Sequence, residues 1–123
     1  MFDSLECIAG DITAVAETDL YEVDRRDLGD ALIQVRTVIR RLEAVELTLT
    51  RAHDHRQAWK DDGANSAKQW HRDRRRLSAG QAARQVETAR ELTNLPKTAE
   101  KVATGEISVE QAAAAARAVR AER

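Results

Sequence analysis

The densest cluster of positive charge lies in SAKQWHRDRRRLSAGQAARQV, residues 66–86. On a helix, Arg72, Arg75 and Arg76 would share one face, because they are three and four residues apart. Guanidinium groups match phosphate oxygens bidentately, and Lys68 extends this face by one turn. The pattern therefore predicts contacts to double-stranded DNA from five residues, which are Lys68, Arg72, Arg75, Arg76 and Arg84.

A second explanation is that these arginines pair with carboxylates of the same protein. Residues 1–62 contain 8 Lys and Arg against 14 Asp and Glu, whereas residues 63–123 contain 12 against 7. Such an asymmetry indicates either a nucleic-acid surface or attraction between the two halves, within one chain or between two chains. The acidic partners expected in the second case are Glu17, Asp19, Glu22 and Asp24.

The remaining reactive side chains argue against catalysis. His53 and His55 are two residues apart, so on a helix they point about 200° away from each other and cannot share a metal ion. No histidine has a partner at the i, i+4 spacing of metal-binding helices. A phosphate-binding loop would follow a strand, and the sequence has no strand pattern. We therefore expect no catalytic residues, no metal site and no cofactor.

The basic residues must be positioned by helices whose starts are marked by serines. Ser66, Ser78 and Ser108 each precede a glutamine by three residues, which is the capping-box pattern. Gly63 suits a turn with positive φ. The expected segments are 67–76, a helix from Ser78 to TNLP (93–96), 97–104, and a last helix from Ser108 to the terminus. The last two have the lengths of a helix-turn-helix pair, although the final helix is poor in base-reading side chains.

The first half is predicted to contain a helix over 3–17, an acidic connector over 18–24, and one long helix over 25–57. Apolar residues recur along the long helix at a heptad-like spacing of four and three. Glu46 interrupts the repeat. The stripe either packs against the chain's own helices or forms a homodimer through Leu28, Leu32, Val35, Ile39 and Leu42.

Composition sets the class of protein. Charged residues make up 33% of the 123 residues and aromatic residues 3%, which is typical of helices with one apolar stripe. We expect an all-α fold in a single domain, 1–123, with an acidic long-helix region (1–57) and a basic multi-helix region (58–123). The single cysteine, Cys7, excludes an internal disulfide and fits the cytoplasm. No apolar run is long enough to span a membrane, and no signal peptide is evident.

Several residues match a known family in order and in approximate spacing. They are Trp59, Gly63, Ser66, Trp70, Leu77-Ser78, Ala89, Leu92, Leu95-Pro96 and Gly105-Glu106-Ile107-Ser108. With them the chain resembles the actinobacterial domain of unknown function 222 family, the N-terminal region of HNH endonuclease proteins. The resemblance implies a helical, DNA-associated module. The chain stops at Arg123 without an HNH signature, so we expect it to be truncated relative to a longer HNH-type protein.

Two functions remain open from the sequence. The first is a DNA-binding or DNA-associated accessory module of an HNH endonuclease-type protein, without catalytic residues of its own. The second is a helical oligomerisation or protein-interaction module that binds no nucleic acid.

Overall fold

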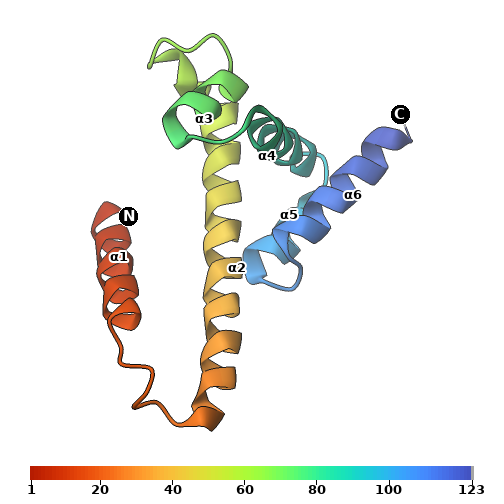
Figure 1. Cartoon of the computed structure of the whole chain (residues 1–123). Helices are drawn as coiled ribbons and strands as arrows, with labels where there is room; N and C mark the ends of the chain where they lie inside the picture. The colour runs from red at the N-terminus through yellow and green to blue at the C-terminus, as the bar shows by residue number, and fades with distance from the viewer. Residues whose placement is uncertain (123) are drawn as a thin grey trace. The chain divides into compact units, whose positions relative to one another are not determined.

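The computed structural model describes residues 1–122 and shows a chain built from α-helices (Figure 1). The elements are α1 (Phe2–Ala16), α2 (Arg25–His55), the 3₁₀ turn η1 (Ala58–Lys60), α3 (Ala67–Arg75), α4 (Ala79–Leu92), α5 (Pro96–Thr104) and α6 (Val109–Ala121). No strand occurs within residues 1–122. The predicted all-α fold is therefore confirmed, and all the predicted helices are present with ends shifted by one or two residues.

The chain divides into two compact units, Met1–Val35 and Arg36–Arg123, and the division falls inside α2. From the sequence we expected a single domain with an acidic region over 1–57 and a basic region over 58–123, and that description stays a prediction. The C-terminal part of α2 belongs to the second unit because it supplies Ala44 and Leu47 to the core of that unit.

The first unit contains α1, the connector and the start of α2. Leu5, Ile8, Ile12 and Val15 lie on one face of α1 at three- and four-residue spacing, but no residue of α1 is buried. α2 begins where a carboxylate satisfies a free N–H group, because Asp24 Oδ1 accepts a hydrogen bond from the Arg26 N–H at 2.9 Å. Asp24 thus caps the start of α2.

The core of the second unit is made mostly of small side chains on facing helices, which allow close helix packing. Its buried members are Ala44 and Leu47 of α2, Ala89 and Leu92 of α4, Val102 of α5 and Ala112 of α6. Leu95, Ala99, Ile107 and Val109 pack against this cluster from its edge. The core therefore holds α2, α4, α5 and α6 together and leaves α3 to be fixed mainly by α4.

Serine caps fix where the helices of the second unit begin. Ser78 Oγ accepts from the Gln81 N–H at 3.1 Å, while Gln81 Oε1 accepts from the Ser78 N–H at 3.1 Å. Ser108 and Gln111 repeat this reciprocal pair before α6. At α3 the pattern is only half present. Ser66 Oγ accepts from the Gln69 N–H, but Gln69 Oε1 accepts from the Asn65 N–H at 2.8 Å.

Two glycines end segments in the left-handed region, where a side chain would be strained. Gly63 has φ 78° in the turn before α3, and Gly105 has φ 82° after α5. α5 and α6 pack against each other across Gly105. α6 buries Ala112 and Ala116 against its neighbours. A helix-turn-helix role for the α5–α6 pair stays a prediction.

Candidate nucleic-acid interface

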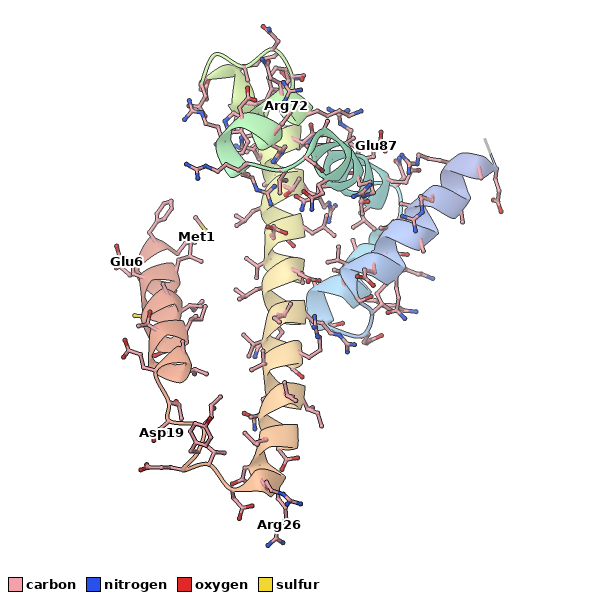
Figure 2. The ribbon with its side chains drawn as sticks, in the orientation of Figure 1. Met1, Glu6, Asp19, Arg26, Arg72 and Glu87 are labelled. Carbon is pink, nitrogen blue, oxygen red and sulfur yellow. The ribbon has the colours of Figure 1, made fainter. Side chains whose placement is uncertain are left out.

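α3 exposes one side and buries the other. Ala67 and His71 are buried, whereas Lys68 and Arg72 are exposed. Together with Asn65, Ser66, Gln69 and Ala79, these two cations line a groove of about 390 Å³ between α3 and the start of α4. Figure 2 shows Arg72 on α3. The structure thus brings two of the five sequence-predicted DNA contacts, Lys68 and Arg72, to one groove.

Arg75 is held by polar groups from three helices. Its Nη2 donates to Glu46 Oε2 of α2 at 2.6 Å, and its Nη1 donates to Gln85 Oε1 of α4 at 2.7 Å. Nη1 also lies 2.9 Å from Nδ1 of His71, one turn earlier in α3. Only 22% of the Arg75 side chain is exposed. Arg75 therefore joins α2, α3 and α4. Its carboxylate partner lies in the acidic half of the chain, but it is Glu46 and not one of the four carboxylates expected from the sequence.

Lys68 has a carboxylate partner. Its Nζ lies 3.3 Å from Glu87 Oε1 on α4, while Glu87 Oε2 accepts from Arg120 Nη1 of α6 at 2.8 Å. The hydrogen bond from Arg120, with a smaller contribution from Lys68, lowers the pKa of Glu87. Glu87 (labelled in Figure 2) therefore stays charged near neutral pH and connects α3, α4 and α6.

Arg76 is not on the helix face that the sequence suggested. α3 ends at Arg75, and Arg76 is its C-cap in the left-handed region, with φ 55°. The three-and-four spacing argument consequently applies to Arg72 and Arg75 but not to Arg76. The Arg76 side chain is exposed, and within residues 1–122 no carboxylate lies within ion-pairing distance of it.

Arg76→Gly is expected to stabilise the fold while removing a cation. A left-handed conformation costs a residue with Cβ about 1–2 kcal/mol, and the extra freedom of glycine in the unfolded chain offsets about half of that. We expect the free energy of unfolding to rise by about 0.5 kcal/mol in urea denaturation followed by circular dichroism. Arg74→Gly, inside α3, is the matched control and should lower it by about 1 kcal/mol. A loss of stability in Arg76→Gly would show that the Arg76 side chain has a structural role.

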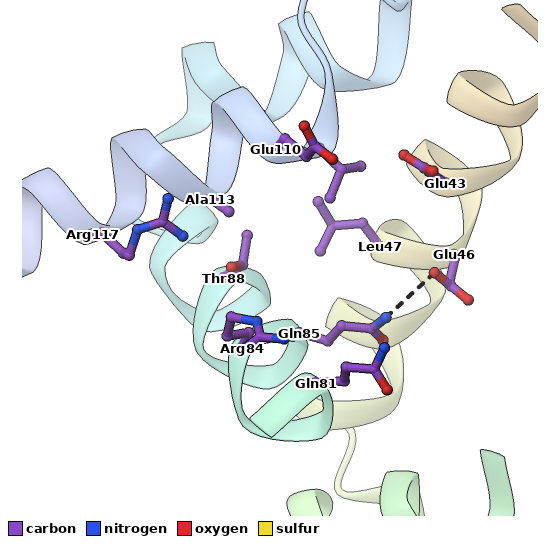
Figure 3. A pocket seen from close by; sticks show the side chains of 11 residues that line it. Glu43, Glu46, Leu47, Gln81, Arg84, Gln85, Thr88, Glu110, Ala113 and Arg117 are labelled. Carbon is purple, nitrogen blue, oxygen red and sulfur yellow. Dashed lines mark hydrogen bonds between the residues drawn. The ribbon is translucent and has the colours of Figure 1, made fainter. Parts of the chain in front are cut away.

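Arg84 occupies a different groove, of about 370 Å³, between α2, α4 and α6 (Figure 3). Arg84 and Arg117 form one wall, and Glu43, Glu46 and Glu110 line the same groove. Leu47, Val109 and Ala113 provide apolar lining. Arg84 therefore belongs to the same fold unit as Lys68 and Arg72, but it lines a different groove.

A ring cluster beside α3 was not foreseen from the sequence, which compared only His53 with His55. His53 of α2 contacts Trp70 with the ring centroids 4.1 Å apart and the ring planes tilted by 42°, and its centroid is 5.3 Å from that of His71. Trp70 Nε1 donates to Asp62 Oδ2 at 2.8 Å. Burial is the largest cause that lowers the pKa of both histidines, and the pKa of His71 falls to about 4. The cluster fixes the start of α3 on the end of α2.

The His71 tautomer follows from its neighbour. A guanidinium can only donate, so Nδ1 accepts from Arg75 and the proton of the neutral ring resides on Nε2. Nε2 is buried and has no hydrogen-bond partner within residues 1–122. His71 is therefore a buried neutral residue whose ring contacts Arg75, Trp70 and His53.

The geometry defines a small all-helical module with exposed cations on α3 and no cluster of three or more His, Cys, Asp or Glu side chains suited to a metal within residues 1–122. No helix in that range is long and apolar enough to cross a membrane. Residues 30–121 match the family model described as a domain of unknown function (DUF222), and the chain belongs to this family. No curated protein and no solved structure matches the chain.

Proposed function

We propose that this chain is a DNA-associated accessory module that contacts the duplex backbone through the α3 basic surface, defined as Lys68, Arg72 and Arg76. The proposal rests on a difference in ion pairing between neighbouring arginines. Arg75 is engaged by Glu46, Gln85 and His71, whereas Arg76 has no carboxylate partner within residues 1–122 and Arg72 has only the adjacent Asp73 at 3.4 Å. Side chains left in this state are available to phosphates.

The supporting chemistry is electrostatic rather than base-specific. The groove that Lys68 and Arg72 line also presents the Ser66, Asn65 and Gln69 side chains, which are groups that hydrogen-bond phosphate oxygens. Such contacts position a protein on DNA without reading its sequence. An accessory role in an HNH endonuclease-type protein is what the family resemblance implies, and it is part of this proposal.

Fluorescence anisotropy with a labelled duplex tests the proposal through its salt dependence. With Lys68, Arg72 and Arg76 each contacting a phosphate, the association constant should fall roughly 40-fold between 50 and 200 mM salt. Arg72→Ala/Arg76→Ala should reduce the slope of log K against log salt by about two. Arg84→Ala alone should reduce it by about one if the α4 groove also faces the duplex.

The matched control is Arg25→Ala/Arg26→Ala, which removes two exposed arginines from α2 and should bind like the wild type. Equal binding by the Arg72→Ala/Arg76→Ala variant and this control would remove the α3 basic surface from consideration. Absence of binding to any duplex at 50 mM salt would overturn the DNA proposal as a whole.

A further inference from the structure

The exposed large apolar side chains are confined to one part of the chain. Within residues 1–122 they all fall between Met1 and Leu49. They are Met1, Phe2, Leu5, Ile12, Val15, Leu20, Tyr21, Leu28, Leu32, Ile33, Val35, Val38, Val45 and Leu49. A concentration of exposed apolar side chains on helices of one part of the chain points to an interaction surface there. The basic surface of α3 lies outside this part of the chain.

In the second unit, α2 uses opposite faces for two purposes. Ala44, Leu47 and Thr50 are buried on the face toward the core. Val38, Leu42, Val45 and Leu49 follow one another at four, three and four residues and lie on the other face, where Val45 is 48% exposed. The core of this unit therefore leaves an apolar stripe on α2 without cover.

The first unit also has apolar side chains that no other part of the unit covers. Leu28, Leu32 and Val35 are exposed on α2, and Leu32 is 72% exposed. α1 has an apolar face and no buried residue. A helix of 15 residues is marginal in water by itself, because helical stability comes mainly from packing of the apolar face. α1 consequently requires a surface to pack on.

We propose that these faces are covered by a second copy of this chain, in a dimer where α1 of each copy packs on the exposed stripe of α2 of the other. The heptad-like spacing on α2 favours a helix as the occupant. The exposed apolar side chains together supply on the order of 1,000 Å² of surface per copy, compared with about 800 Å² per partner in a stable interface.

Charge complementarity supports this pairing. Residues 1–24 contain seven Asp and Glu and no Lys or Arg, and Figure 2 shows Glu6 on α1. Arg36 lies four residues after Leu32 and Arg41 lies four residues before Val45, so both exposed arginines border the apolar stripe of α2. Neither has a carboxylate partner within residues 1–122. An acidic helix with an apolar face thus matches an apolar stripe next to unpaired cations.

Sedimentation equilibrium of the full chain is the first test. We expect a species of twice the 13.7 kDa chain mass at micromolar concentration. Leu32→Asp/Val45→Asp should raise the dimer dissociation constant at least tenfold, by about 1.4 kcal/mol or more. Because both side chains are exposed in the monomer, the helical circular dichroism should be retained. Thr37→Asp/Thr48→Asp makes the same charge change at exposed positions of α2 that lie off the stripe, and it should leave the dimer intact.

Charge reversal separates packing between copies from packing within one copy. Glu6→Lys/Asp11→Lys and Arg36→Glu/Arg41→Glu should each weaken self-association, and mixing the two variants should restore a dimer containing one of each. The exposed Cys7 of α1 is the single cysteine of the chain, so a spin label there reports an inter-copy distance only when the dimer forms. A wild type that stays monomeric at 100 µM, or a mixture that does not reassociate, would overturn the proposal.

Discussion

The free energy of unfolding of the wild type should fall by about 3 kcal/mol more between pH 7 and about pH 4 than that of His71→Gln. His71 is 2% exposed, and burial, the Arg75 guanidinium and His53 together lower its pKa from 6.5 to about 4, while Asp54 opposes them. Because the folded-state pKa is the lower one, the unfolded chain takes up the proton first as the pH falls. The stabilisation by neutral His71 is complete above pH 6.5 and is lost progressively down to about pH 4.

Urea denaturation at a series of pH values measures this difference. Protein concentration must be held constant, since self-association shifts apparent stability. His55→Gln removes an imidazole from an exposed position and serves as the control. Parallel pH profiles for the wild type and His71→Gln would mean that the ring is not held neutral by its surroundings.

Arg75→Ala should lower the free energy of unfolding by about 2 kcal/mol at pH 7, whereas Arg72→Ala should change it by less than about 0.5 kcal/mol. Arg75 bonds Glu46 and Gln85 from two other helices, and its loss leaves their polar atoms and His71 Nδ1 without a donor. Arg72 has only the neighbouring Asp73, with both side chains more than half exposed. Arg75 therefore contributes to the stability of the fold, whereas Arg72, three residues earlier, contributes little to it.

The measurement is again urea denaturation, followed by far-ultraviolet circular dichroism at one protein concentration. Glu46→Gln tests the same contact from the other side. This variant keeps an acceptor for the guanidinium but removes the charge. It should therefore lower the free energy of unfolding by less than Arg75→Ala does. Equal stability of Arg75→Ala and Arg72→Ala would contradict the structural assignment of Arg75.

The helix positions were predictable because the signals that set them are local. Ser78 and Gln81, or Ser108 and Gln111, satisfy each other's backbone groups within four residues, so the sequence alone identifies both starts. The end of α3 was harder to predict from the sequence, because Arg76 adopts a left-handed conformation that residues other than glycine usually avoid. Nothing in its local sequence, such as a glycine, signals that turn.

The partners of the basic residues were not predictable in detail because they depend on packing. Glu46 is 29 residues from Arg75, and Asp54 is 36 residues from Arg90, with which it forms two hydrogen bonds of 3.0 and 2.9 Å. The sequence suggested Glu17, Asp19, Glu22 and Asp24 as the acidic partners, and neither Glu46 nor Asp54 was among them. The long helix shows the same limit. Its regular stripe stands out in the sequence, yet the core uses Ala44 and Leu47 from the other face.

Glu87 keeps one cationic partner when the other is engaged elsewhere, because it pairs with both Lys68 and Arg120. Lys68 and Arg120 neutralise opposite oxygens of one carboxylate. When Lys68 turns toward an incoming anion, Arg120 still compensates the Glu87 charge, and the α4–α6 junction keeps its connection. Lys68 can therefore leave Glu87 without creating an unpaired carboxylate in the helical scaffold.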